Sequence, residues 1–318
     1  MGAFFLTTKG NSAVNTHRAE NAFLNMGLSG PQKMLFGEYE LLLYGKIRDS
    51  SDKNCISAAE GIAFFCGTML YGNSERSMVL EAVYSDFLAG DLDQRELMGV
   101  FFLCIYHNGR LNIFHDNMTT YQAYYATSTF CISSSFIALA ESLDKLLTID
   151  LPNVYANIIS GFSIGKTTTF QEIHKFEHRF PFENKDLICH VADSVNLQHY
   201  SSFDEAVILQ IEYLECYFGK VKSFLGNKLN KVDIGLSAGF DSRLILAIAN
   251  KTLENLQLHS NAKKIPDKDL LISRQLATAL ERRLVEVPVK TSDEMSKEEL
   301  AKKQIKKQKQ IKKQKQIK

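Results

Sequence analysis

The chain has 318 residues, of which 45% are hydrophobic, so it can bury the cores of about two domains. Nine of its 37 basic residues are lysines in positions 301–318, which hold no acidic residue, so the preceding 300 residues carry 28 basic and 36 acidic residues, a net charge of −8. This acidic body gives no support to nucleic-acid binding. No apolar run approaches the roughly 18 residues of a membrane span, and no secretory signal begins the chain. We therefore expect a cytoplasmic protein with neither nucleic acid nor membrane as a partner.

Residues 1–195 are predicted to be rich in strands. Short aromatic and aliphatic runs predict strands at Tyr39–Tyr44, Met98–Tyr106 and Leu111–His115, and His107–Gly109 predicts a hairpin turn between the last two. Apolar residues at helical spacing predict a helix over Ser77–Leu88. Sheets packed against helices are expected.

The pattern changes to an alternation of helices and strands from about Ser202. Such alternation predicts a parallel, doubly wound sheet that binds its ligand at the carboxyl ends of the strands. The expected elements in chain order are a helix at Phe203–Leu225, a strand at Val232–Leu236, a helix at Ser242–Lys251, a strand at Leu256–His259, a helix at Asp269–Leu280 and a strand at Leu284–Val289.

The six cysteines are widely spread and contain no Cys-x-x-Cys pair. This spacing favours free, mostly buried thiols in a reducing compartment over a zinc site or a disulfide framework. They are Cys55, Cys66, Cys104, Cys131, Cys189 and Cys216.

The turn that follows the strand at Val232–Leu236 is the most informative stretch. Gly239 lets backbone approach a ligand, Ser237 and Ser242 supply hydroxyl groups, and the next helix points its first N–H groups at the same place. Phosphate oxygens fit these donors. Asp241 would be repelled by bare phosphate, so we expect it to bind a divalent metal that bridges the phosphates. No lysine follows the glycine, which excludes a Walker-type loop.

The run Ser237-Ala238-Gly239-Phe240-Asp241-Ser242 resembles the Ser-Gly-Gly-x-Asp-Ser pyrophosphate loop of ATP pyrophosphatases, specifically the asparagine synthetase group. Ala238 departs from the pattern, because it occupies the first glycine position. The resemblance implies that Leu236, Ser237, Ala238, Gly239, Phe240, Asp241 and Ser242 bind ATP and that Asp241 holds Mg²⁺. It also implies transfer of AMP to a carboxylate.

Features upstream of the loop resemble the same group, in the same order. They are Leu97–Phe101, His115-Asp116, Tyr124-Tyr125, Ser134–Leu139 and the connecting segment Gly161–Ile173. The resemblance implies an α/β protein: a glutaminase-like αββα domain of the N-terminal nucleophile type over 1–195, a partial doubly wound sheet domain of the adenine nucleotide α-hydrolase type over 200–292, and a Lys/Gln-rich tail over 293–318.

The glutaminase-like half lacks the residues its chemistry needs. That reaction uses an N-terminal cysteine thiolate, whereas removal of Met1 would expose Gly2. The family's substrate-binding Asn-Gly-Glu-Ile-Tyr-Asn corresponds to Tyr44–Asp49 here, and its Asp-x-Glu to Ser74-Glu75-Arg76. We expect no glutaminase activity.

The synthetase half is short. Asp269–Ala277 resembles the family's acidic-start helix, but the later Gly-x-Gly-Gly-Asp-Glu motif is absent and two copies of Lys-Lys-Gln-Lys-Gln-Ile follow. Isoleucines six residues apart advance by about 240° around a helix, so they form no packing seam. Two functions stay open. The chain is either an AMP-forming amide ligase acting on a small-molecule or peptide carboxylate, or a non-catalytic remnant that acts with a separately encoded C-terminal half; a homodimer is also open.

Other candidate sites are weaker. His174 and His178 have the spacing of a metal pair on a helix, but aromatic and proline neighbours favour strand or loop. His115-Asp116 and the tyrosines at 121, 124 and 125 are expected to be structural. Gly161–Thr169 contains Gly-Lys-Thr but lacks the upstream glycine of a phosphate loop.

Overall fold

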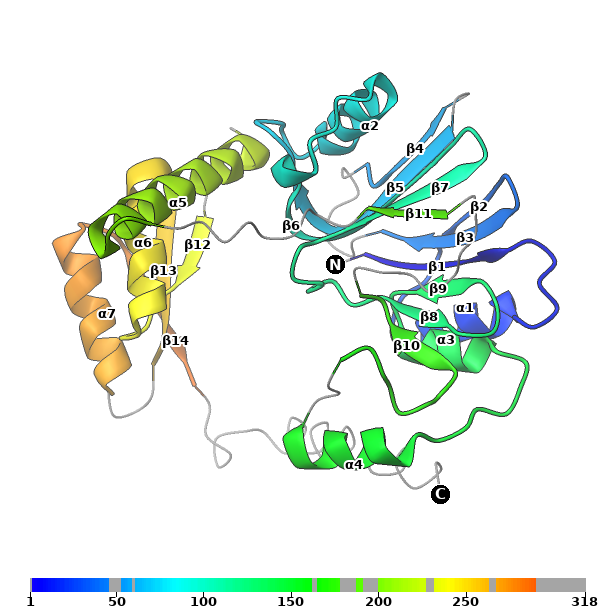
Figure 1. Ribbon diagram of the computed structural model, residues 1–318. Coiled ribbons are helices and arrows are strands. Elements are labelled where there is room, and N and C mark those ends of the chain that lie inside the picture. Colours follow the sequence, from blue (N-terminus) through cyan, green and yellow to red (C-terminus); the bar gives the residue numbers. More distant parts are fainter. Residues whose placement is uncertain are drawn as a thin grey trace. The chain divides into compact units, whose positions relative to one another are not determined.

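The chain forms two compact units in the computed structural model (Figure 1). Unit 1 comprises Met1–Phe203 and Ser223–Gly226, and unit 2 comprises Asp204–Lys222 and Asn227–Lys318. The structure describes residues 2–45, 53–58, 61–161, 165–177, 187–190, 200–226, 232–262 and 267–289. The predicted tail over 293–318 lies outside the described residues.

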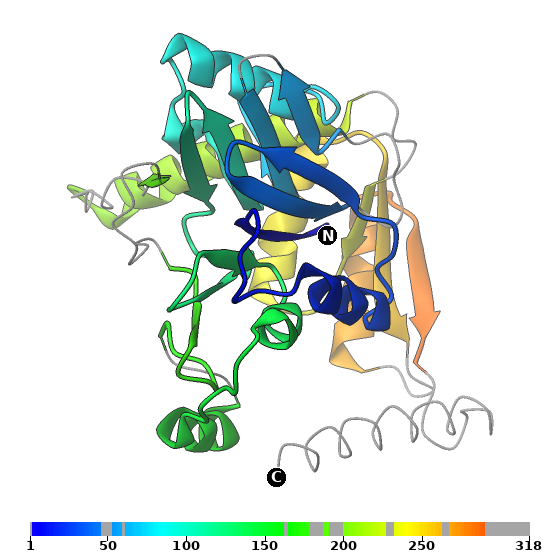
Figure 2. The ribbon, with the colours of Figure 1, turned by 90° about the vertical axis from the view of Figure 1, so that its right-hand side faces the viewer.

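Unit 1 contains a six-stranded antiparallel sheet, in which β1 is central and β8, β9 and β10 are short. Its order is β10 (Ile173–Lys175), β8 (Tyr124–Ala126), β9 (Cys131–Ser133), β1 (Ala3–Thr8), β3 (Tyr39–Tyr44) and β2 (Gln32–Phe36). Figure 2 shows this sheet beside the second sheet of the unit. The predicted strand at Tyr39–Tyr44 is confirmed, and it pairs with both β1 and β2.

The second sheet of unit 1 has five strands. Its order is β11 (Leu187–His190), β7 (Arg110–His115), β6 (Met98–His107), β5 (Gly61–Leu70) and β4 (Cys55–Ala58). Neighbouring strands are antiparallel except β11, which runs parallel to β7. The predicted hairpin between β6 and β7 is confirmed: Asn108 and Gly109 have φ values of 50° and 78°, as a two-residue hairpin turn of this kind requires.

The two sheets of unit 1 face each other across its main core. Phe4 and Leu41 from the first sheet share this core with Phe64 and Phe102 from the second. The rings of Phe4 and Phe102 stack with their centroids 4.6 Å apart. Alternation of side chains along each strand therefore buries one face of each sheet against the other.

Helices cover the outer faces of both sheets. On the first sheet, Ala19 and Phe23 of α1 (Thr16–Asn25) and Leu139 of α3 (Phe136–Ser142) form a second core. On the other sheet, Val79 and Val83 of α2 (Val79–Ala89) form a third. Unit 1 thus has helix, sheet, sheet and helix layers, and the predicted helix near Ser77–Leu88 is confirmed as α2. A 3₁₀ turn at Gln94–Glu96 and helix α4 (Leu151–Ser160) complete the unit.

Local sequence sets where these helices begin. The side chains of Asn15, Ser135 and Asp150 each accept a hydrogen bond from a backbone N–H in the first turn of α1, α3 and α4. Such caps satisfy donors that a helix cannot pair internally. Ser134–Leu139, one of the segments that carried the family resemblance, therefore has a structural role as a strand end and helix cap.

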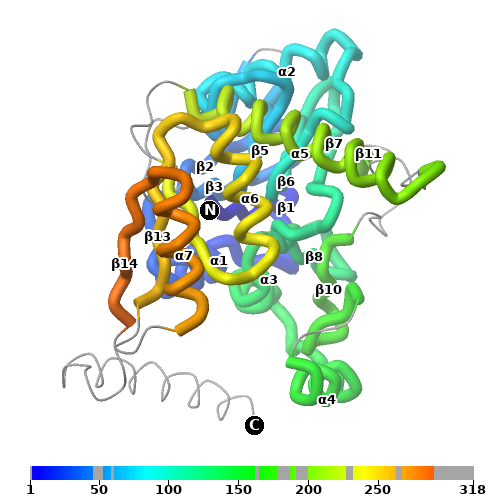
Figure 3. The backbone as a smooth tube through the Cα atoms, turned by 90° about the vertical axis from the view of Figure 1, so that its left-hand side faces the viewer, coloured from blue at the N-terminus to red at the C-terminus, as the bar shows by residue number. Residues whose placement is uncertain are grey.

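Unit 2 is built on a small parallel sheet ordered β12 (Val232–Gly235), β13 (Leu256–Ala262) and β14 (Leu284–Pro288). Helix α6 (Phe240–Thr252) connects β12 to β13, α7 (Lys268–Ala279) connects β13 to β14, and α5 (Phe203–Leu225) precedes them. Figure 3 follows β13, α7 and β14 along the chain. The predicted alternation and parallel pairing are confirmed. The predicted helix start at Ser242 is wrong by two residues, because the extended residue Gly239 caps a helix that begins at Phe240.

The helices of unit 2 pack on one face of its sheet. Ile234 and Leu258 are buried with Phe218 of α5, Leu246 of α6 and Ala277 of α7. The alternate residues of β12, which point to the other face, are exposed. A doubly wound sheet has helices on both faces, so the described part of unit 2 shows only the coarser arrangement of a three-stranded parallel sheet with one helix layer.

Among the described residues, no helix combines the length and the apolar character needed to cross a bilayer.

Candidate phosphate-binding site

The segment Leu236–Ser242, here called the loop, comprises the residues that join β12 to α6 and the first three residues of α6, at the carboxyl end of the parallel sheet. The Leu236 N–H donates to the His259 carbonyl at 2.8 Å, which extends the pairing of β12 with β13 by one residue. The Leu236 carbonyl accepts from the Ser273 hydroxyl on α7 at 3.2 Å. Leu236 is buried, so the base of the loop is fixed to both neighbouring elements.

Three consecutive loop amides donate to side chains of unit 2. Ser237 N–H donates to Ser242 Oγ at 3.2 Å, Ala238 N–H to Asp269 Oδ1 at 2.9 Å, and Gly239 N–H to Ser237 Oγ at 3.2 Å. The hydroxyls of Ser237 and Ser242 are themselves 3.0 Å apart. The three loop amides are thus paired with protein acceptors, which an incoming phosphate would have to replace.

Alanine in place of the family's first glycine causes no backbone strain. Ala238 is not among the described residues with a positive φ, so its Cβ is tolerated. Gly239 has φ −66° and ψ 151°, which any residue can adopt. A Cβ at Gly239 would lie 3.3 Å from Ser237 Oγ, so the glycine matters for close approach to this hydroxyl and not for its φ.

The first turn of α6 supplies the other half of the site. Its cap, Gly239, has no side chain to bond the first-turn N–H groups. The Arg243 Nε donates to the Gly239 carbonyl at 3.3 Å, and its guanidinium lies 4.5 Å from the ring centroid of Phe240. Phe240 is 83% exposed, so it is not a core residue. A helix N-terminus with a nearby cation attracts anions.

Asp241 lies in this first turn and is exposed. An exposed carboxylate beside hydroxyl groups suits Mg²⁺, which commonly takes one or two carboxylates and completes its shell with phosphate oxygens and water. In the part of the chain that the structure describes, no three His, Cys, Asp or Glu residues form a ready metal cluster. Asp241 is an exposed carboxylate in the first turn of α6, and its expected role as a Mg²⁺ ligand stays a prediction.

Sequence reasoning missed two residues of the loop. Asp269 was recognised only as the start of a helix, but its carboxylate reaches the Ala238 amide; Ser273 anchors Leu236. A signal was present, because the carboxyl ends of neighbouring parallel strands meet at one edge of a sheet. The residues that begin the helix after β13 are thereby brought to the loop after β12.

Gly2 stands at the position where the resemblance would place a catalytic cysteine. It is buried at the start of β1, and a Cβ there would lie 2.7 Å from the carbonyl oxygen of Tyr44. The Gly2 carbonyl accepts a hydrogen bond from the Tyr121 hydroxyl at 2.7 Å. Backbone of β3 therefore crowds any side chain at this position.

The other two glutaminase motifs are placed only in part. Lys46–Asp49 lie outside the described residues, while Tyr44 is buried in β3. Ser74-Glu75-Arg76 precedes α2, and the Arg76 N–H donates to the Phe224 carbonyl at 3.1 Å within unit 1. This backbone hydrogen bond gives Arg76 a structural role.

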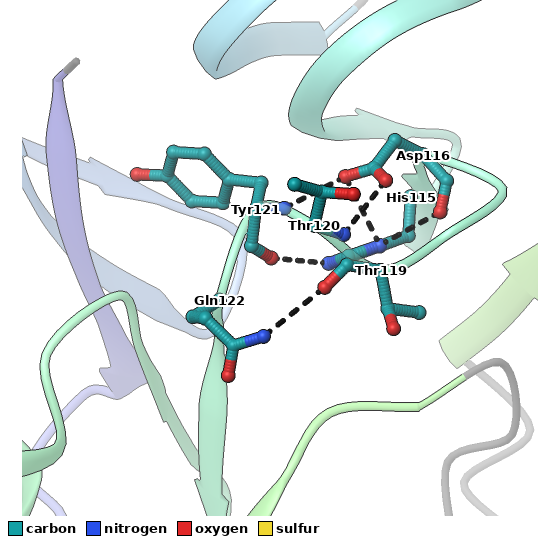
Figure 4. Close-up of polar contacts among 6 residues, drawn as sticks. All are labelled: His115, Asp116, Thr119, Thr120, Tyr121 and Gln122. Atoms are coloured by element: carbon teal, nitrogen blue, oxygen red, sulfur yellow. Dashed lines mark hydrogen bonds and ion pairs between the residues drawn. The ribbon is translucent and has the colours of Figure 1, made fainter. Parts of the chain in front are cut away.

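His115-Asp116 forms a buried structural network (Figure 4). The Asp116 carboxylate accepts the backbone N–H groups of Thr120 at 2.8 Å and Tyr121 at 2.9 Å. His115 Nε2 lies 2.7 Å from the Tyr121 carbonyl, and its Nδ1 lies 3.2 Å from the Asp116 carbonyl. Both side chains are 3% exposed, so they hold the turn after β7 and are closed to a substrate.

The remaining histidine candidates are separate. His174 lies in β10 with its Nδ1 3.3 Å from the Tyr125 hydroxyl, and burial lowers its pKa. His178, like Phe162–Ile164 of the segment Gly161–Thr169, lies outside the described residues. The structure does not test the predicted absence of a His174–His178 metal pair.

One further histidine, His190, is held by a polar chain in the second sheet. Its Nε2 lies 2.9 Å from Asn112 Oδ1, and the Gln94 Nε2 lies 3.2 Å from its Nδ1. The ring stacks on Phe114 with a centroid distance of 4.2 Å. An amide nitrogen can only donate, so Nδ1 accepts and the ring is neutral with its proton on Nε2. Burial lowers the pKa of His190, in keeping with this neutral form.

We find no protein-family model and no curated protein that matches this chain. The case for a site therefore rests on the residues and geometry of the loop.

Proposed function

We propose that unit 2 binds the triphosphate of ATP with Mg²⁺ at Leu236–Ser242 and that the protein is an AMP-forming amide ligase of the asparagine synthetase type. One observation carries this proposal. A strand, a loop with two serine hydroxyls, and a helix N-terminus with an exposed carboxylate converge at the carboxyl edge of a parallel sheet. Ligands of α/β proteins bind at such edges.

The loop residues would serve the departing pyrophosphate. Ser237, Gly239 and Ser242 would donate to its oxygens, and Asp241 would hold Mg²⁺, which supplies charge neutralisation when bound. A substrate carboxylate would attack the α-phosphorus as the bond to the bridging oxygen of pyrophosphate breaks. An amine would then attack the activated carbonyl, release AMP and lose its proton to water.

In this proposal unit 1 is a glutaminase-like domain of the N-terminal nucleophile type without glutaminase chemistry. Its helix, sheet, sheet and helix layers support the fold assignment. Gly2 offers no thiol, and the Tyr44 carbonyl leaves no room for one. The amine would therefore be a substrate supplied to the ligase and not ammonia from glutamine.

A second candidate is a non-catalytic partner of a separately encoded C-terminal half. One observation favours it: Asp233 and Gly235 of β12 are exposed on the sheet face opposite the helices. Parallel sheets are commonly covered on both faces, so a further chain could complete the domain. In that case the loop would bind nucleotide only in the complex.

Carboxylate-dependent exchange of pyrophosphate into ATP separates the two candidates. The protein is incubated with MgATP, labelled pyrophosphate and a panel of carboxylic acids. The ligase predicts exchange that requires one class of acid and is lost in Asp241→Ala, while Asp233→Ala on the opposite sheet face retains it. No exchange with any acid would favour the non-catalytic partner.

A further inference from the structure

The Asp269 carboxylate occupies a position that a phosphate oxygen would need. It accepts the Ala238 N–H at 2.9 Å, and Ala238 is the middle residue of the three whose amides donate to side chains. A carboxylate oxygen and a phosphate oxygen use the same kind of donor in the same way. Both cannot accept from Ala238 in the same geometry.

The other two loop amides have neutral acceptors. Ser237 N–H donates to the Ser242 hydroxyl, and Gly239 N–H donates to the Ser237 hydroxyl. A hydroxyl can turn and donate to an arriving anion, so these two contacts convert easily from acceptors of amides into donors to phosphate. Asp269 cannot do so, because an ionised carboxylate only accepts and repels phosphate.

The backbone of Asp269 is anchored separately from its side chain. The Ser273 hydroxyl lies 2.7 Å from the Asp269 carbonyl and 3.2 Å from the Leu236 carbonyl, which ties the first turn of α7 to the base of the loop. Asp267 caps the same turn by accepting the Leu270 N–H at 3.2 Å. The exposed Asp269 side chain can therefore rotate away while the helix stays in place.

We propose that Asp269 is a built-in competitor of the anion at this loop: it holds the Ala238 amide while the site is free and must be displaced when phosphate binds. The inference rests on the proposed phosphate site and adds to it a residue that sets affinity. Asp269 thereby maintains the conformation of the loop when no anion is bound. It also lowers the affinity for pyrophosphate, which favours release of this product.

Pyrophosphate binding by the full chain, measured by titration calorimetry with and without Mg²⁺, tests this role. Asp269→Asn keeps an acceptor of the same size but removes the charge, and Asp269→Ala removes the acceptor. We expect both variants to bind pyrophosphate about tenfold more tightly than the wild type, which is about 1.4 kcal/mol. Glu254→Gln makes the same charge change at the other end of the sheet, before β13, and should leave the affinity unchanged.

Each outcome has a defined meaning. The competitor role would be overturned if the wild type binds pyrophosphate and both Asp269 variants bind it equally well or more weakly, while their thermal unfolding is unchanged. If the variants bind pyrophosphate more weakly only when Mg²⁺ is present, Asp269 is instead a metal ligand. Binding by the wild type that Asp241→Ala abolishes would leave the proposed function standing in either case. No binding by any form would overturn both proposals.

Discussion

The residue before β1 and the loop after β12 are the two places where the family resemblance puts reactive groups, and they are closed in different ways. At Gly2 the obstacle is backbone, since a Cβ would meet the Tyr44 carbonyl at 2.7 Å. At the loop the obstacles are side chains of Ser237, Ser242 and Asp269, which can rotate. Closure by backbone leaves no room for a side chain, whereas closure by rotatable polar side chains can be reversed when a ligand replaces their hydrogen bonds.

The largest effect is expected at Asp116, which supports the closed region. Its buried carboxylate accepts the Tyr121 N–H, and the Tyr121 hydroxyl in turn donates to the Gly2 carbonyl. Asp116→Ala leaves the buried Tyr121 amide and the part-buried Thr120 amide without their acceptor and His115 without its carboxylate neighbour, so we expect the free energy of unfolding of unit 1 to fall by about 3–5 kcal/mol. Denaturant unfolding measures this. Asp116→Asn, which keeps one acceptor oxygen, should lose less, and equal losses in both variants would contradict the account.

A side chain at Gly2 is expected to have the next largest effect. Gly2→Ala must displace the Tyr44 backbone, at a cost of about 1–3 kcal/mol in the free energy of unfolding. Gly45→Ala is the matched control, because a Cβ at Gly45 meets no atom within 4 Å. If the two variants were equally stable, the start of β1 would have room for a side chain and the contrast with the loop would disappear.

In contrast to Gly2, Ser242 should affect pyrophosphate binding as well as stability. Ser242→Ala removes the acceptor of the half-buried Ser237 N–H, so we expect a loss of about 0.5–1.5 kcal/mol in the stability of unit 2. Pyrophosphate affinity should fall by about tenfold, because a donor to the anion is lost. Thr252→Ala is the control, because it removes a hydroxyl from the far end of the same helix, where it donates to the Ile248 carbonyl. This variant should leave the pyrophosphate affinity unchanged. Unchanged pyrophosphate affinity in Ser242→Ala would remove Ser242 from the site.

The smallest effect is a dependence of stability on pH in unit 1. Burial lowers the pKa of His190 and of His174 below the ordinary value of 6.5 in the folded protein. Below pH 6.5 the unfolded chain binds protons that the folded chain does not, so stability is full above this pH and falls as the pH drops toward the folded pKa values. Unfolding measured between pH 7.5 and about pH 5 should show a shallower fall in His190→Gln than in the wild type. An identical slope would mean that His190 does not titrate differently on folding.

The sequence predicted the repeating patterns well and the contacts between distant residues poorly. Alternation and turn chemistry predicted the hairpin at Asn108-Gly109 and the parallel direction of β12, β13 and β14, because these depend on local sequence patterns. The bond from Ala238 to Asp269 joins residues 31 positions apart, and the crowding of Gly2 by Tyr44 joins β1 to β3. Such contacts depend on strand order and register, which no single segment reveals.

The most direct test of the phosphate site is a titration of ¹⁵N-labelled protein with pyrophosphate and Mg²⁺, followed through the backbone amide signals. We predict saturable shifts of the Ala238, Gly239 and Asp241 amides, which Asp241→Ala abolishes in the presence of Mg²⁺, while amides of β1 in unit 1 stay unchanged. Amides of the loop that do not respond at saturating pyrophosphate would contradict a phosphate-binding function.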